Sequence, residues 1–234
     1  MAKQKIEIET QADKLRKREV RMKVLKIGLL ITVMFLVILY FLLNLFYSNG
    51  DFTVILDQNL SRDKGIIMYE NSKDKVNRMI LEAPRPDTMD NISINWLPKN
   101  INDEADGSHN GQNYIAYTFY IENLGLDTDY WYSIAIDDVI KNVDEAARIM
   151  VYLNGKSTVY AKMAKNGKPE PGTTPFYSDQ YVLMEKRAGM KTGDIDKFTV
   201  VIWVEGDDPE CTDSIIGGEM KMHMEIQEES VGQN

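Results

Sequence analysis

The sequence predicts a mainly β protein, in which a single N-terminal transmembrane helix precedes an antiparallel β-sandwich of Ig-like or jelly-roll type. Three observations lead to this prediction. Residues 27–47 are 21 uncharged and strongly apolar positions. From residue 51 onward, about ten short runs of β-branched and aromatic residues are separated by turn-forming segments. Strands do not alternate with long helices, as they would in a parallel sheet.

Composition excludes several classes of protein. One cysteine and two histidines among 234 residues are too few for an internal disulfide framework, an iron–sulfur cluster or a histidine-built metal centre. The formal charge of −9 and the pI near 4.9 argue against nucleic acid as a partner. The charge is uneven along the chain. Residues 1–26 hold nine basic and four acidic residues, a net +5, which leaves −14 for everything after the uncharged span.

The segment IGLLITVMFLVILYFLLNLFY (27–47) has the length of a membrane span, because 21 residues at about 1.5 Å each reach roughly 31 Å. Seven basic residues lie between Lys14 and Lys26, whereas residues 48–65 carry two, Arg62 and Lys64. The positive-inside rule therefore predicts a single-pass protein of the cell membrane, with residues 1–26 in the cytoplasm and the C-terminal domain outside it.

Two alternatives accompany this topology. The basic tail is expected to be a solvated flank that touches anionic lipid headgroups, but it could also extend the membrane helix into the cytoplasm. A signal peptide cut near Ser48-Asn49-Gly50 is the alternative to an uncleaved anchor. The apolar stretch is longer than that of signal peptides and no Ala-x-Ala follows it, which favours the anchor.

The strands follow from patterning. Alternation is clearest in YIAYTFYIEN (114–123), and Asn154-Gly155 predicts a tight hairpin turn between strands at 148–154 and 157–162. The other strands are expected at 52–58, 65–70, 78–83, 92–97, 131–136, 180–188, 197–206 and 219–228. Residues 98–113 are expected to form a long exposed loop, 165–175 a proline-rich loop and 137–147 a short helix. The sandwich thus covers 51–227, followed by a flexible tail at 228–234.

Catalytic motifs are absent from the sequence: it contains no His-Glu-x-x-His, no Gly-x-Ser-x-Gly and no Walker-type glycine loop. His109 and His223 are expected at the surface. Cys211 is expected to pack as a small apolar group, because a catalytic cysteine needs a histidine base beside it. We therefore predict no catalytic residues and no organic cofactor.

Acidic residues gather after one apolar strand. Glu205, Asp207, Asp208, Glu210 and Asp213 surround Pro209 within nine positions. Carboxylates at this density suit a weak Ca²⁺ site, since Ca²⁺ takes six to eight oxygen ligands from flexible loops. The spacing does not match an EF-hand. The favoured interpretation is a turn whose side chains cap the backbone and solvate the end of the strand.

The stretch TVVIWVEGDDPECTDSIIGGEMKMHMEI (199–226) resembles the C-terminal portion of the TasA/camelysin-like proteins of Gram-positive bacteria. The specific part is the region from Trp203 to Gly218, and the resemblance extends over about residues 110–226. It implies an exported β-sandwich associated with surface fibres and biofilm matrix. Camelysins are described as metalloproteases, but this sequence supplies no recognisable set of zinc ligands. Family members usually carry a cleavable signal peptide, so the anchor-length helix here favours a membrane-tethered relative.

Three functions are therefore considered. The leading hypothesis is a non-enzymatic, membrane-anchored domain that acts in cell-surface structure or assembly through protein–protein contacts, by strand-edge pairing with other envelope or surface proteins or with itself. The first alternative is a camelysin-type metal-dependent protease. The second is a ligand-sensing ectodomain of a membrane complex, which would need a partner because the tail of 26 residues is too short for a signalling domain.

Overall fold

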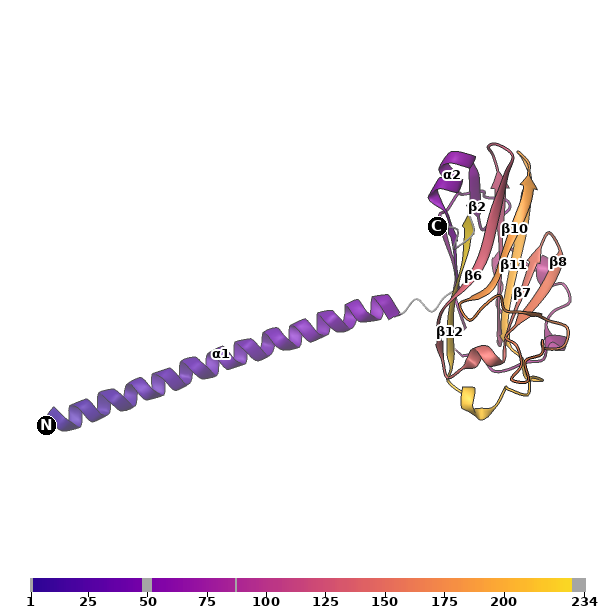
Figure 1. Cartoon of the computed structure of the whole chain (residues 1–234). Helices are drawn as coiled ribbons and strands as arrows, with labels where there is room; N and C mark the ends of the chain where they lie inside the picture. Colours follow the sequence, from indigo (N-terminus) through magenta and orange to yellow (C-terminus); the bar gives the residue numbers. More distant parts are fainter. Residues whose placement is uncertain (1, 48–51, 87, 229–234) are drawn as a thin grey trace. The chain divides into compact units, whose positions relative to one another are not determined.

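The computed structural model describes residues 2–47, 52–86 and 88–228. The chain divides into two compact units, Met1–Asn49 and Gly50–Asn234 (Figure 1). The first unit contains one helix, and the second is mainly β and built from two sheets. The predicted fold class is thereby confirmed. Of the predicted tail, residues 229–234 fall outside the described residues, as does the cleavage position considered near residues 48–50.

Helix α1 (Ala2–Tyr47) is continuous over 46 residues, so the basic flank belongs to the same helix as the apolar segment. Within it, Arg21–Phe41 is long and apolar enough to cross a membrane, with a mean hydropathy of 2.6 and none of it buried inside the protein. By length and composition this segment is a membrane span or a signal sequence.

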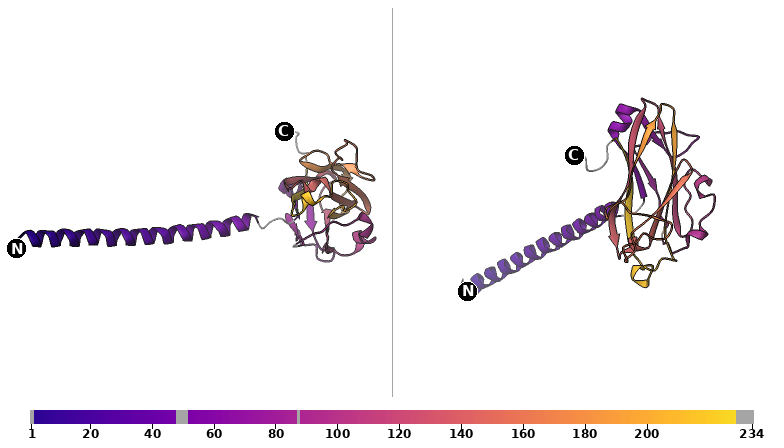
Figure 2. Two further views of the ribbon diagram at one scale, coloured as in Figure 1. Left: turned by 90° about the horizontal axis from the view of Figure 1, so that it is seen from below. Right: turned by 45° about the vertical axis from the view of Figure 1, so that its right-hand side comes forward.

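The two sheets of the second unit pack face to face (Figure 2). The five-stranded sheet has the order β10 (Tyr181–Met190), β6 (Thr128–Ile140), β12 (Glu219–Gln227), β1 (Phe52–Leu56) and β3 (Ile80–Ala83). The seven-stranded sheet has the order β2 (Ile66–Tyr69), β5 (Tyr114–Asn123), β11 (Ile195–Val204), β7 (Ala147–Leu153), β8 (Lys156–Ala161) and β9 (Thr174–Pro175), with β4 (Gly107–Ser108) paired to β5. Pairing is antiparallel except for β1 with β12 and β8 with β9.

The main core lies between the sheets. Alternation along β5 and β11 turns Tyr117, Phe119 and Phe198 inward, and the rings of Phe119 and Phe198 stack with centroids 5.2 Å apart. From the opposite sheet, Tyr132 meets Phe198 edge to face at the same centroid distance. These contacts fix which face of each strand is internal, because a slip by one residue would expose the whole set.

The seven-stranded sheet is buried on its outer face as well. Ile92, Leu97 and Ile101 cover Val201 and Trp203 there. The covering segment contains the 3-10 turns η1 (Ile94–Trp96) and η2 (Ile101–Asp103). Part of the segment 98–113 therefore packs on the outer face of the sheet, whereas its polar composition predicted a wholly exposed loop. The strand expected at 92–97 is reduced to a single bridge at Ile92 followed by η1.

One further local prediction was wrong, and one short helix was not predicted. The helix expected over 137–147 is absent: β6 continues to Ile140 because Val139 and Ile140 pair with β12, and only the 3-10 turn η3 (Val143–Glu145) follows. Conversely, the polar segment after β1 forms α2 (Gln58–Lys64), which is capped by the Asp57 carboxylate. The hairpin turn at Asn154-Gly155 is confirmed, with φ of 52° and 80°.

Candidate cation site

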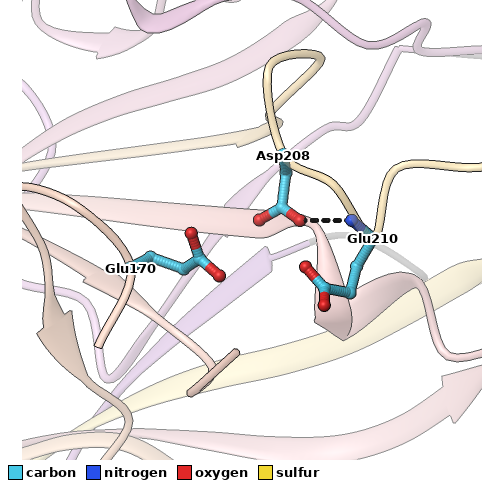
Figure 3. A group of neighbouring side chains, drawn as sticks. All are labelled: Glu170, Asp208 and Glu210. Carbon is cyan, nitrogen blue, oxygen red and sulfur yellow. Dashed lines mark hydrogen bonds between the residues drawn. The ribbon is translucent and has the colours of Figure 1, made fainter. Parts of the chain in front are cut away.

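Three carboxylates meet at the end of the sandwich where β7 begins and β11 ends (Figure 3). Asp208 and Glu210 come from the acidic turn after β11, and Glu170 comes from the loop between β8 and β9. One oxygen from each residue lies within 4.8 Å of the others. Among the described residues this is the one group of three or more acidic, histidine or cysteine side chains with such spacing.

Arg148, on β7, supplies the positive charge of this site. Its side chain is 5% exposed and forms an ion pair with Asp208, whose side chain is fully buried. The same guanidinium nitrogen lies 3.7 Å from Glu170 Oε2, a longer and weaker contact. The second terminal nitrogen donates to the carbonyl of Ala147. The guanidinium of Arg148 thus pairs mainly with Asp208. Three carboxylates beside one guanidinium leave the cluster with two negative charges in excess.

Two of the carboxylates lack hydrogen-bond donors within the described chain. Glu210 donates its backbone N–H to Asp208 Oδ1 at 2.7 Å, but its own Oε2 is buried and has no partner. Glu170 is 7% exposed, and its contact of opposite charge is the distant one with Arg148. Burial and the charge of Asp208 raise the pKa of the Glu170 carboxyl, although Arg148 acts in the opposite direction.

The other acidic residues of the turn lie outside this cluster and make different contacts. Glu205 Oε2 accepts hydrogen bonds from Trp203 Nε1 at 3.0 Å and from the backbone N–H of Ile94 at 3.1 Å. Asp207 Oδ2 accepts from Ser93 Oγ at 2.7 Å. Asp213 is exposed and opens the 3-10 turn η4 (Asp213–Ile215). Glu205 and Asp207 therefore fasten the segment that precedes Trp96 to the end of β11.

Of the five residues predicted for a Ca²⁺ site, the structure brings Asp208 and Glu210 together and directs Glu205 and Asp207 elsewhere. It adds Glu170 and Arg148, which sequence reasoning did not include. Glu170 stands between Pro169 and Pro171 in a loop far from the turn along the chain. No short-range spacing connects it with Asp208, so only the fold could identify it.

The donor set consists of oxygens, which suits hard cations such as Ca²⁺ or Mg²⁺ better than Zn²⁺. Neither histidine contributes. The His109 side chain is 6% exposed, less than expected for a surface residue, and its Nε2 lies 3.0 Å from Thr118 Oγ1. His223 lies 2.9 Å from Asp137 on the five-stranded sheet.

A cavity of about 500 Å³ with a mixed polar and apolar lining opens at the same end of the sandwich, between the sheets. Its apolar lining includes Phe52, Met89, Ile115, Ile202, Met220 and Met222. Arg85 and Glu219 also line it and form an ion pair at 3.9 Å. Cys211 lines the cavity too and packs with Val143 and Ile215. Burial, together with the nearby charge of Asp208, raises the pKa of the thiol, which makes it a poor nucleophile at neutral pH.

Comparison with known proteins yields no family. No protein-family model matches the chain, and no curated protein sequence matches it. Similar solved structures include two of a β-glucosidase from Kluyveromyces marxianus, one in complex with glucose and one labelled with selenomethionine. Both are 14% identical to this chain over 68% of its length, with TM-scores of 0.23 and 0.25. The chain spans 15% and 17% of those β-glucosidase chains. At such TM-scores the similarity carries no argument about this protein.

Proposed function

We propose that the chain is a membrane-anchored, non-catalytic surface domain, which acts in cell-surface structure or assembly through protein–protein contacts. The observation that carries the proposal is the apolar segment of α1, Arg21–Phe41, of which none is buried inside the protein. Twenty-one residues of this composition are costly to expose to water and suit the hydrocarbon of a bilayer. The basic residues on the N-terminal flank favour a cytoplasmic tail and an extracytoplasmic domain.

An exposed tryptophan supports a contact function. Trp96 on η1 is 75% exposed, although tryptophan is a residue that folded proteins usually bury in large part. Its segment is held in place by the hydrogen bonds that the Ile94 N–H donates to Glu205 and that the Ser93 hydroxyl donates to Asp207. A rigidly presented tryptophan is typical of the few residues that dominate binding energy in protein interfaces.

The edges of the five-stranded sheet point to a second contact. Among the described strands, β3 pairs with β1 alone and presents Ile80, which is 54% exposed. At the opposite edge, β10 has two irregularities in its register and carries Lys186 and Arg187, features that discourage pairing with another strand. Strand addition from a partner or from a second copy would therefore take place at β3.

The test is co-purification of the full chain from detergent-solubilised membranes. We expect a partner or a second copy to be recovered with the natural chain and to be lost with Trp96→Ala or Ile80→Lys. Tyr177→Ala is the matched control, because Tyr177 is 64% exposed and lies in a different loop. Equal recovery with all four proteins would contradict a contact function at these two places.

A ligand-binding ectodomain is the second candidate, and the cavity of about 500 Å³ favours it. Such a volume lies within the range of small-molecule sites, and the lining combines apolar side chains with charged ones such as Arg85 and Glu219, as is typical of sites for small molecules with both apolar and polar groups. Native mass spectrometry of the full chain would then detect a bound small molecule. The signal should disappear with Met220→Trp, which fills the cavity, and persist with Tyr177→Ala.

The sequence resemblance of residues 199–226 to TasA/camelysin-like proteins is compatible with an assembly function and stays a prediction. A protease of the camelysin type is less well supported by the described residues, because their candidate metal ligands are carboxylates without a histidine.

A further inference from the structure

We propose that Glu170, Asp208 and Glu210 bind one divalent cation, best matched by Ca²⁺, which connects the loop between β8 and β9 to the turn after β11. This site is independent of the proposed membrane anchoring. It differs from the sequence prediction because only two of the five residues predicted there take part.

The cluster carries an excess of negative charge. Three carboxylates surround one guanidinium, and Arg148 is paired mainly with Asp208. Two negative charges are therefore left uncompensated in a region where Asp208 is fully buried and Glu170 is 7% exposed. Buried charges are costly unless they are paired or coordinate a metal. One divalent cation would neutralise this excess.

The missing hydrogen bonds are an independent observation. Glu210 Oε2 is buried without a partner in the described part of the chain. The buried Glu170 carboxylate receives no hydrogen bond there either, and it points toward Asp208 and Glu210 (Figure 3). Buried polar atoms in folded proteins nearly always have a partner, so Glu210 Oε2 indicates a positively charged ligand beside it.

The donor chemistry favours one kind of cation. The three oxygens lie within 4.8 Å of one another, which is compatible with a shared divalent cation. Mg²⁺ requires strict octahedral geometry and gives up its bound waters reluctantly, whereas Ca²⁺ accepts irregular sets of carboxylate oxygens from loops. We expect Ca²⁺ to bind more tightly than Mg²⁺.

The decisive experiment is calorimetric titration of the full chain in detergent micelles with CaCl₂, after treatment with a chelator. One Ca²⁺ per chain is expected, with a Kd of about 10⁻⁴–10⁻³ M as in extracellular calcium modules. The melting temperature should rise by several degrees in excess Ca²⁺ and by less in Mg²⁺. Glu170→Gln and Glu210→Gln should each weaken binding at least tenfold. Asp213→Asn, an exposed acid of the same turn outside the cluster, should leave it unchanged.

Proteolysis of the natural chain gives a second test, which does not depend on how well the variants fold. Lys165 is exposed in the loop that contains Glu170, so a bound cation should slow cleavage after Lys165 by lysyl endopeptidase. The proposal is overturned if Ca²⁺ and chelator give the same melting temperature and the same cleavage rate. It is equally overturned if Asp213→Asn weakens binding as much as Glu170→Gln does, because the acidic turn would then attract ions non-specifically.

Discussion

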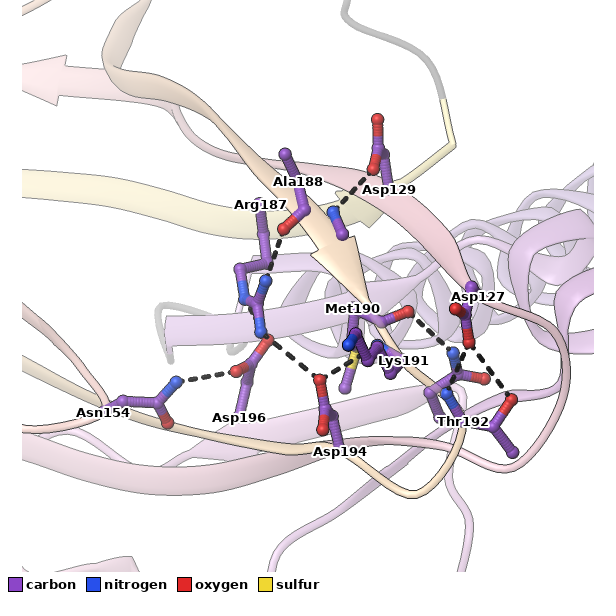
Figure 4. A network of polar contacts seen from close by, with 12 residues as sticks. Asp127, Asp129, Asn154, Arg187, Ala188, Met190, Lys191, Thr192, Asp194 and Asp196 are labelled. Atoms are coloured by element: carbon purple, nitrogen blue, oxygen red, sulfur yellow. Dashed lines mark hydrogen bonds and ion pairs between the residues drawn. The ribbon is translucent and has the colours of Figure 1, made fainter.

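At the scale of single residues, a buried aspartate joins the two sheets. Asp196 on β11 is 1% exposed and accepts hydrogen bonds from Tyr130 Oη at 2.8 Å, Asn154 Nδ2 at 2.7 Å and Arg187 Nε at 2.9 Å. Arg187 and Asn154 converge on it from β10 and from the turn after β7 (Figure 4). Burial and the charge of Asp196 raise the pKa of the Tyr130 hydroxyl, which keeps that donor protonated.

Removal of this carboxylate should be strongly destabilising. Asp196→Ala would leave the buried Tyr130 hydroxyl and the partly buried Arg187 guanidinium without their acceptor, at a cost of about 3 kcal/mol in the free energy of unfolding. Asp194→Ala is the matched control. Its side chain is 44% exposed and lies 3.8 Å from Arg187, so a loss of about 1 kcal/mol or less is expected. Urea denaturation of both variants measures the difference, and equal losses would contradict the role assigned to Asp196.

His223 should make stability depend on pH. Burial opposes its charged form, but hydrogen bonds and charges from Asp137 and Glu225 outweigh burial and raise the pKa of the imidazole. A raised pKa in the folded state stabilises the protein fully below about pH 6.5, the unfolded value, and this contribution is lost as pH rises through the folded pKa. Burial lowers the pKa of His109, so this residue makes the stability change with pH in the opposite direction. The contribution of His223 must therefore be measured as a difference between the natural chain and a His223 variant.

We therefore expect the difference in unfolding free energy between the natural chain and His223→Gln to shrink from pH 6 to pH 8. Chemical denaturation at a series of pH values measures that difference. A constant difference over this range would contradict a raised pKa of the His223 imidazole in the folded protein.

At the scale of elements, the sequence predicted those strands whose run of β-branched and aromatic residues is clear or whose turn chemistry is specific. YIAYTFYIEN coincides with β5, and Asn154-Gly155 forms the expected hairpin turn, because both signals are local. The segment 137–147 was misassigned because pairing with β12 overrides its helical propensity. The cover formed by residues 92–103 and the approach of Glu170 to Asp208 depend on contacts between segments far apart in sequence, for which no periodic signal exists.

The contact between α2 and the turn after β5 depends on two glycines. A Cβ on Gly125 would lie 2.0 Å from the carbonyl oxygen of Lys64, and one on Gly65 would lie 2.8 Å from the Gly125 Cα. Gly125→Ala must therefore separate the two backbones, at an expected cost of about 1–3 kcal/mol. Gly155→Ala is the control: it has φ of 80° and open space around it, so only the backbone penalty of about 1 kcal/mol applies. Thermal denaturation distinguishes the two, and a Gly125 variant as stable as the natural chain would contradict the close approach.

At the scale of the whole molecule, charge is separated along the chain. A net +5 precedes the uncharged residues 27–47, and −14 follows them. In the proposed topology the basic flank of α1 lies against the anionic cytoplasmic leaflet, where each basic residue contributes on the order of 1 kcal/mol. The acidic domain then lies in the extracytoplasmic space, where millimolar Ca²⁺ would be available to the cluster of Glu170, Asp208 and Glu210.

This topology predicts that the basic flank determines orientation. With the natural chain, protease added to intact, wall-stripped cells should digest residues 51–234 and spare the N-terminal tail. Neutralising Arg18, Arg21, Lys23 and Lys26 to glutamine should invert a fraction of the chains and so protect their domains from protease. The control neutralises four exposed lysines of the domain (Lys99, Lys156, Lys165 and Lys168) and should leave the digestion pattern unchanged. A domain that is protected in the natural chain would refute the proposed orientation. A mature N-terminus near residue 51 would refute the uncleaved anchor, because α1 would then be a signal sequence.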